Sequence, residues 1–266
     1  MKRLLRDLKK YRFYLFYSAK SELRAEVAGS YLNWLWWILD PLLFMLVYSF
    51  IVRIVFSSRE EYFSAFVLVG LTVWNFFNKT VQGSVGVIRK NKSVVSKIYL
   101  PKYLLILTNM LVLGFKMLVS LALIFVLMIF LGVPFTWHIL HALPVLLVTV
   151  LLTFGIAIFF MHFGVFVQDL RNVTTVLLRL VFYMTGVFYS IPLRVPAPYG
   201  QLLLRCNPVA FVTESLRGAL LYGTAPDYLL LLLWGAVGAV LSLCGILMVY
   251  RYENSYAKVI YWLHLP

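Results

Sequence analysis

Six stretches of this sequence are apolar over about 20 residues or more, and short polar connections separate them. At a rise of about 1.5 Å per residue, each stretch forms a helix long enough to cross a hydrocarbon core of about 30 Å. Long apolar segments satisfy their own backbone hydrogen bonds in lipid only as helices, so we expect an all-α, polytopic membrane protein. The six predicted transmembrane helices are 33–52, 63–87, 104–131, 139–167, 173–193 and 228–250.

The composition agrees with a membrane protein. Hydrophobic residues make up 62% of the chain and charged residues 13%, whereas soluble domains are about 45–50% apolar and about 25% charged. The formal net charge is +14, which in a soluble domain would suggest nucleic-acid binding. Here the cations lie beside apolar segments and no separate basic domain exists, so we expect contact with anionic membrane lipids and no nucleic acid.

The segment 88–103 fixes the predicted topology. It carries five Lys or Arg and no acid, and it lies between the second and third spans, where a basic loop marks the cytoplasmic side. With the N-terminus inside, the expected cytoplasmic parts hold 16 Lys or Arg and the outer parts hold 5. We therefore predict a multi-pass protein of the bacterial cytoplasmic (inner) membrane with both termini in the cytoplasm.

The chain is expected to be a single transmembrane domain, residues 1–266. Residues 1–32 form a cytoplasmic segment, 33–250 a six-span bundle and 251–266 a cytoplasmic tail. Within the first segment, aromatic and basic residues alternate in a way that suits an N-terminal amphipathic helix lying in the headgroup layer.

The connection 194–227 between the fifth and sixth spans is too polar to cross the membrane, yet it contains a helix-like run at 208–221. Pro208 suits the first turn of this helix and Gly223 suits its end. Four apolar side chains have the spacing of one helix face, which predicts a short amphipathic outer helix. They are Val209, Val212, Leu216 and Leu220.

Four ionisable residues lie within the predicted spans, where charge is costly and therefore a functional candidate. Counted from the cytoplasmic ends, Asp40, Lys79 and Arg179 share a depth of about 9 to 12 Å. They either face a polar cavity or pair across helices, or the two cations snorkel to the headgroups while Asp40 joins a polar network. Lys116 lies nearer the middle of its span, which favours a cavity or a carboxylate partner.

Aromatic residues make up 17% of the chain, and many of them fall within the spans. Aromatic faces can stack on the apolar faces of sugar rings, while packing against lipid is the alternative explanation for most of them. The candidates for a substrate channel are Trp74, Phe77, Phe159, Phe163, Tyr183 and Tyr189.

Several classes of enzyme are not supported by the sequence. No Gly-x-x-x-x-Gly-Lys-Ser/Thr loop occurs, so any use of ATP is expected on a partner. The four histidines lack metal-ligand spacing, and no Ser/His/Asp arrangement stands out, so we predict no metal site and no catalytic residue. Cys206 and Cys244 show no pairing pattern and are expected to act as small apolar side chains.

Four stretches, in this order, resemble one family. The run 28–43 (Ala-Gly-Ser-Tyr-Leu-Asn-Trp-Leu-Trp-Trp-Ile-Leu-Asp-Pro-Leu-Leu) is similar to a signature with GS, then W, then PL, and 90–101 (Lys-Asn-Lys-Ser-Val-Val-Ser-Lys-Ile-Tyr-Leu-Pro) to one ending in Phe-Pro. The run 166–172 contains Asp-Leu, and 207–211 reads Asn-Pro-Val-Ala-Phe, followed by Glu and Arg. Together they resemble the transmembrane permease subunits of bacterial polysaccharide-exporting ABC transporters, the O-antigen and teichoic-acid exporters.

The resemblance implies a homodimer of six-span subunits with two copies of a cytoplasmic ABC ATPase. ATP and Mg²⁺ would bind that partner, and this chain would carry no cofactor and no enzymatic activity. The basic loop would receive the ATPase through Val94, Val95, Lys97, Ile98, Tyr99 and Pro101. Outer gate helices would include Asn207, Pro208, Phe211, Glu214 and Arg217. The first and fifth spans would line a lateral opening for a lipid-linked polysaccharide.

Other functions remain compatible with the residues. An ABC permease for a drug, a lipid or haem would have the same general pattern, and a secondary transporter would need no ATPase. A membrane scaffold is a third class, although intramembrane charges and an outer amphipathic helix exceed what an anchor requires.

Overall fold

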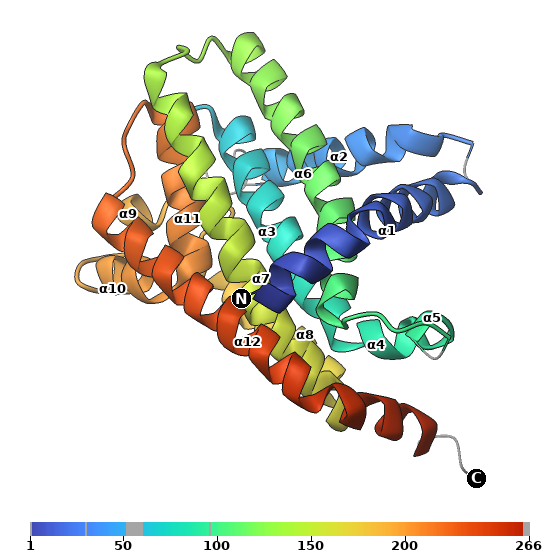
Figure 1. The fold of residues 1–266 in the computed structure, drawn as a ribbon. Coiled ribbons are helices and arrows are strands. Elements are labelled where there is room, and N and C mark those ends of the chain that lie inside the picture. The colour runs from blue at the N-terminus through green and yellow to red at the C-terminus, as the bar shows by residue number, and fades with distance from the viewer. Residues whose placement is uncertain (1, 30, 52–60, 96, 263–266) are drawn as a thin grey trace.

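A computed structural model describes residues 2–29, 31–51, 61–95 and 97–262, and every regular element within them is helical (Figure 1). The predicted all-α class is therefore confirmed. The elements in chain order are α1 (Lys2–Val27), η1 (Asn33–Leu35), α2 (Trp36–Phe50), α3 (Phe63–Val85), α4 (Val87–Lys90), α5 (Lys92–Val95), α6 (Tyr103–Leu131), η3 (Trp137–His141), α7 (Ala142–Phe166), α8 (Leu170–Tyr183), α9 (Ile191–Arg194), α10 (Tyr199–Cys206), α11 (Pro208–Arg217), η4 (Gly218–Tyr222) and α12 (Tyr228–Trp262).

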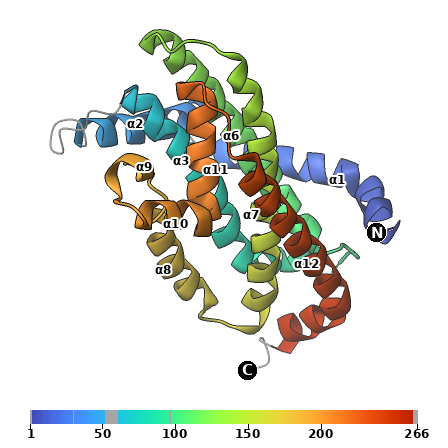
Figure 2. The same cartoon turned by 90° about the vertical axis from the view of Figure 1, so that its left-hand side faces the viewer.

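Helix α3 is the centre of the bundle. It packs against α2, α6, α7, α8 and α11, and most of its side chains are buried (Figure 2). A helix enclosed by protein can carry polar groups such as Asn75, Lys79 and Gln82, because few of its side chains need to face lipid. Among the described residues, three helices are both long and apolar enough to cross a membrane on their own, namely Tyr103–Leu131, Trp137–Phe166 and Tyr228–Tyr256.

One predicted span is shorter in the structure than in the sequence analysis. The first span, predicted as 33–52, is helical from η1 at Asn33 through the 15 residues of α2 to Ile51, and residue 52 lies outside the described residues. The fifth span was predicted as 173–193, but α8 has 14 residues and ends at Tyr183. At about 1.5 Å per residue, α8 is about 21 Å long, which is less than the hydrocarbon core.

The carbonyl groups at the end of α8 are satisfied by side chains, which is what allows the helix to stop there. The Tyr189 hydroxyl donates to the carbonyl oxygen of Tyr183 at 2.7 Å. The Asn207 amide donates to the carbonyl oxygen of Met184 at 3.1 Å. Because the last carbonyls of any helix lack an intrahelical partner, these bonds replace water that lipid would not supply.

Arg217 provides the strongest anchor in this region. Its guanidinium, 1% exposed, donates to the carbonyl oxygens of Gly186 at 2.9 Å, Val187 at 2.7 Å and Phe66 at 3.2 Å. It also pairs with Glu214 at 3.3 Å and lies 3.4 Å from the centre of the Phe66 ring. Carbonyl dipoles, a carboxylate and a ring face together compensate a buried cation. Arg217 thereby fastens α11 to α3 and to the turn after α8.

Helix α11 begins and ends where the sequence predicts. Pro208 occupies the first position, the Asn207 side chain accepts hydrogen bonds from the two following backbone N–H groups, and Gly223 ends the helical region with a φ of +59°. The prediction of one buried face is too narrow, however. Phe211 and Thr213 are buried as well, because α11 packs against both α3 and α7.

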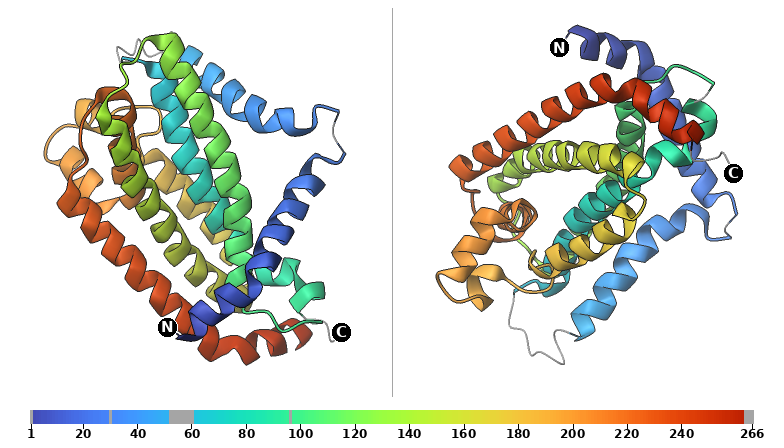
Figure 3. Two further views of the ribbon diagram at one scale, coloured as in Figure 1. Left: turned by 45° about the horizontal axis from the view of Figure 1, so that its top comes forward. Right: turned by 90° about the horizontal axis from the view of Figure 1, so that it is seen from below.

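Helices α7 and α12 are the most extensively packed pair, and glycines allow their backbones to approach closely (Figure 3). A Cβ atom added to Gly238 would lie 3.0 Å from the backbone nitrogen of Leu152, and one added to Gly245 would overlap Ile158. Small residues at such crossings are typical of helices that pack in membranes. Helix α12 also continues through the predicted boundary at residue 250 into the segment that was expected to be a tail.

We predict that Gly70→Ala destabilises the protein. An added Cβ would lie 2.6 Å from an Arg217 Nη atom and 3.1 Å from the Val187 carbonyl oxygen, and the guanidinium cannot move without losing its carbonyl acceptors. The free energy of unfolding should fall by about 1–3 kcal/mol, which thermal unfolding of the purified protein would detect. Gly114→Ala is the control, because a Cβ there meets nothing within 4 Å. Equal unfolding temperatures for the two variants would contradict the prediction.

Candidate functional site

The basic segment forms two four-residue helices, α4 and α5, and then an extended stretch that leads into α6. It lies at the same end of the bundle as the N-terminus and the last turns of α12, which we call the basic end (Figure 3). Lys97, Ile98 and Tyr99 are exposed, and Val94 and Val95 are half-buried. Five of the six predicted contact residues are therefore at least partly accessible.

Pro101 is the exception among those six residues. It is buried, together with Leu100 and Lys102 on either side of it. This placement corrects the expectation that Pro101 contacts a partner. It instead seats the end of the segment against the bundle, directly before α6 begins at Tyr103.

The six aromatic channel candidates do not form one surface within the subunit. Trp74 and Phe77 lie in the core at 6% and 7% exposed, so the structure does not place them on a lining surface. Trp74 packs on Phe182 with ring centres 5.1 Å apart. Phe163 and Tyr183 are exposed, on α7 and α8 respectively.

The two remaining candidates are partly accessible. Phe159 and Tyr189 are of intermediate exposure, and Tyr189 is committed to its hydrogen bond at the end of α8. Phe163 and Tyr183 are thus the candidates with the most free ring surface.

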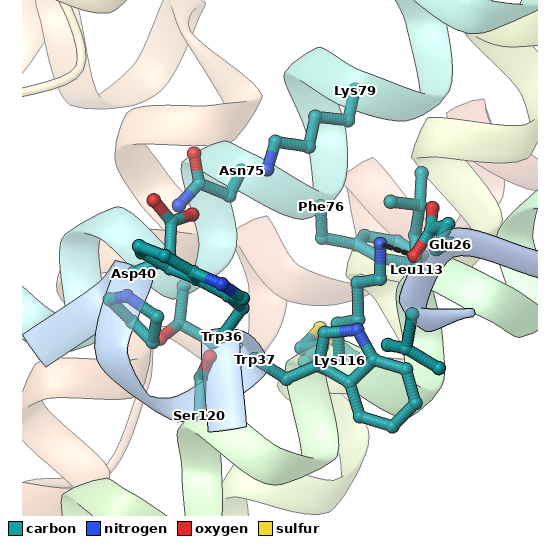
Figure 4. A pocket seen from close by; sticks show the side chains of 14 residues that line it. Glu26, Trp36, Trp37, Asp40, Asn75, Phe76, Lys79, Leu113, Lys116 and Ser120 are labelled. Atoms are coloured by element: carbon teal, nitrogen blue, oxygen red, sulfur yellow. Dashed lines mark ion pairs between the residues drawn. The ribbon is translucent and has the colours of Figure 1, made fainter. Parts of the chain in front are cut away.

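Three of the four intramembrane charges line one cavity (Figure 4). The cavity has a volume of about 290 Å³ and lies between the end of α1, the start of α2, α3 and α6. Asp40, Lys79 and Lys116 face it, whereas Arg179 is an exposed residue of α8 and is absent from its lining. Of the alternatives that the sequence left open, a shared cavity therefore describes Asp40, Lys79 and Lys116, whereas Arg179 is exposed on α8, as a cation that snorkels would be.

Lys116 has a carboxylate partner. Its Nζ atom lies 2.6 Å from Glu26 Oε2, and the side chains are 25% and 41% exposed. Because Glu26 is on α1, this pair joins the N-terminal helix to the middle of α6. A carboxylate partner was one of the two alternatives that the sequence left open for this lysine.

On the opposite side of the same cavity, Asp40, Asn75 and Lys79 lie near one another (Figure 4). Among the described residues, neither Asp40 nor Lys79 forms an ion pair within 4.0 Å. The cavity thus contains two acids and two bases, of which one pair is closed. Its charges balance overall, so it is a polar compartment rather than an anion site.

A second, larger cavity lies along the same seam toward the basic end, and the sequence analysis missed it. Its volume is about 590 Å³, and its polar lining comes from α1, α3, α6, the end of α4 and the first turn of α8. Part of the signal was available in the spacing of polar residues along two helices. On α3, Asn75, Lys79 and Gln82 follow each other at i, i+4 and i+7, and on α6, Asn109 and Lys116 are seven residues apart, so each set shares a helix face. Each face runs from the first cavity, at Asn75, Lys79 and Lys116, to the second, at Gln82 and Asn109.

Among the described residues, no group of three or more His, Cys, Asp or Glu is placed to hold a metal ion. Two of the histidines lie beside tyrosine hydroxyls. His162 lies 2.7 Å from the Tyr256 hydroxyl, and His141 lies 2.7 Å from the Tyr228 hydroxyl.

The arrangement as a whole is that of a helical membrane permease, with a central polar helix, polar cavities under an amphipathic N-terminal helix and a protruding basic loop. The family model described as ABC-2 type transporter matches residues 15–221, and the chain belongs to this family.

Two relatives align with nearly the whole length of the chain. The chain is 30% identical over 245 residues to the O-antigen export system permease protein RfbA of Myxococcus xanthus, covering 91% of this chain and 93% of that protein. It is 24% identical over 241 residues to the O-antigen export system permease protein RfbA of Klebsiella pneumoniae, covering 90% and 92%.

We predict that Glu26→Gln destabilises the protein by about 1 kcal/mol, because Lys116 then faces the cavity without a carboxylate. Adding Lys116→Met should restore stability, since no unpaired charge remains. Thermal unfolding of the two single variants and the double variant gives the coupling between the residues. Glu22→Gln is the matched control, because the Glu22–Lys90 pair is longer, at 3.5 Å, and more exposed. Equal shifts for Glu22→Gln and Glu26→Gln would contradict the prediction.

Proposed function

We propose that this chain is the membrane subunit of an ABC transporter that exports a lipid-linked polysaccharide of the O-antigen type across the cytoplasmic membrane. The observation that carries the proposal is the similarity to O-antigen export permeases over about nine-tenths of both chains. A match of that extent includes the basic loop, the central helix and the outer helices together, rather than one shared segment.

The energy source in this proposal is a separate ATPase. Two copies of the ATPase would bind ATP and Mg²⁺ and act on a homodimer of this chain. The distribution of Lys and Arg favours a cytoplasmic location for the basic end and both termini. The exposed side chains at the basic end, above all Ile98 at 49%, supply the apolar contact that a docking surface needs among cations.

The N-terminal helix suits the membrane surface in this arrangement. One face of α1 packs on the bundle, with Leu15 and Ala19 buried. Phe13, Phe16 and Tyr17 lie outside it at 68–78% exposed, where the headgroup layer would cover them. Helix α1 therefore lies on the bilayer surface and leads into α2, which in turn is one of the two short helices expected at a lateral opening.

The proposed function is tested by deleting the gene that encodes this chain. Deletion should abolish the surface polysaccharide and leave the lipid-linked glycan inside the cell, and the glycan that accumulates identifies an O-antigen or a teichoic acid. Unchanged export in the deletion strain would overturn the proposal. Normal glycan levels combined with loss of transport of a drug, a lipid or haem would favour the alternative permease.

Docking is tested by Ile98→Asp, which places a charge on an exposed apolar contact. We expect the ATPase to co-purify with the variant permease at least about tenfold less than with the wild type, because an apolar contact is replaced by a desolvated carboxylate. Phe135→Asp is the matched control, since Phe135 is similarly exposed, at 56%, but lies in the connection between α6 and α7. Membrane insertion should be normal for both variants. Undiminished co-purification with Ile98→Asp would exclude the docking role.

A further inference from the structure

Three segments that are far apart in the sequence meet at the basic end through Tyr99. Arg3 of α1 donates to the Tyr99 hydroxyl at 2.7 Å, and that hydroxyl donates to Glu253 of α12 at 2.9 Å. Arg3 and Glu253 are themselves 3.3 Å apart. Burial and the neighbouring Glu253 raise the pKa of Tyr99, which keeps the hydroxyl protonated and able to donate. We call these three residues the Tyr99 junction.

A second set of contacts, next to the junction, also joins α1 and α12 to the region where the basic segment leads into α6. The Tyr250 hydroxyl donates to Asp7 at 2.7 Å and lies 3.2 Å from the Tyr103 hydroxyl. The Arg3 guanidinium stacks 4.1 Å from the centre of the Tyr250 ring. Lys102, at 5% exposed, lies 3.8 Å from Glu253. Acids and bases balance in this group, so the contacts need no further counter-ion.

The position of the junction along the chain matters. Ile98, the most direct candidate for the ATPase contact, directly precedes Tyr99 in the chain. A displacement of Ile98 would therefore also displace Tyr99 and its hydroxyl group. Tyr11 also donates to the carbonyl oxygen of Tyr99 at 3.0 Å, which ties the backbone of the segment to α1. The exposed loop therefore has a side-chain bond and a backbone bond to the elements behind it.

Each helix that meets at the junction is also packed on a further helix. Helix α12 is held along α7 by glycine crossings in which Gly238 meets the backbone at Leu152. Helix α1 is held to the middle of α6 by Glu26 and Lys116. A push at the junction would thus move α12 with α7 and α1 with α6, because packed interiors transmit displacement rather than absorb it.

We infer that the Tyr99 junction is the joint that passes movement of the basic loop to both α1 and α12, so that Arg3, Tyr99 and Glu253 are positioning residues for transport rather than contacts for the ATPase. This inference rests on the proposed function, because it requires an ATPase that acts on the loop. The inference also assigns different roles to two adjacent residues. Ile98 binds the partner, and the Tyr99 hydroxyl transmits what the partner does.

The decisive variant is Tyr99→Phe, which removes one oxygen atom and keeps the ring. In the complete complex with its ATPase, co-purification and basal ATP hydrolysis should stay at wild-type levels in Glu253→Ala, since Glu253 is on α12 and outside the set of expected ATPase contacts. Polysaccharide exported per ATP hydrolysed should fall in Tyr99→Phe by about two- to tenfold, the range for one lost hydrogen-bond connection. Glu253→Ala should give a fall at least as large. Tyr17→Phe is the matched control, because that tyrosine of α1 is 78% exposed.

A second measurement needs no substrate. Hydrogen–deuterium exchange of residues 246–256 should respond to ATP binding in the wild-type complex and respond less in Tyr99→Phe. Wild-type export per ATP in both Tyr99→Phe and Glu253→Ala would overturn the inference, as would a loss of export that merely follows a loss of folded protein. A wild-type complex that exports no glycan would instead contradict the proposed function, so the two failures are distinguishable.

Discussion

The burial of the Arg217 guanidinium is the interaction on which the interior of the subunit depends. A cation at 1% exposure persists only where its donors all find acceptors, and here the acceptors are backbone carbonyls of α3 and of the turn that follows α8. Those bonds hold the turn that follows α8 against α3, directly after the helix ends at Tyr183. They also require Gly70, since a side chain there would occupy the space of the guanidinium. The packing of α11 on α3, the position of the turn after α8 and one glycine thus depend on one side chain.

Local chemistry made part of this fold predictable. Asn207, Pro208 and Gly223 have the residue types that begin and end helices, and α11 and its extension lie between them. The end of α8 could not be predicted in the same way. Its sequence remains apolar past Tyr183, and the side chains that bond to its last carbonyls, Tyr189 and Asn207, come from later in the chain. Hydropathy shows which residues are compatible with lipid. The position of a helix end depends instead on which hydrogen-bond donors from the rest of the fold reach its last carbonyl groups.

The candidate site was likewise predictable in part from the sequence, and in part only from the tertiary fold. The cost of charge in lipid correctly singled out Asp40, Lys79 and Lys116 as residues that need a polar setting, and they share a cavity. Their depth in separate helices did not predict which of them meet, because helices tilt and Arg179 faces elsewhere. Glu26 was missed because it lies outside every apolar stretch, on a helix that folds back over the bundle. The spacing of polar side chains along α3 and α6 would have revealed the shared seam, since it depends only on helix periodicity.

The two polar networks of the subunit differ in the kind of acceptor they use. Arg217 binds mainly backbone carbonyls, whose positions are fixed by the helices that carry them. The Tyr99 junction uses a hydroxyl and a carboxylate, which are carried by side chains of separate segments. Arg217 therefore joins α11 to backbone groups of α3 and of the turn after α8, whereas the Tyr99 junction joins α1, the basic segment and α12 to one another through side chains. That difference makes the junction a joint between segments, which agrees with the inference that movement of the basic loop reaches α1 and α12 through it.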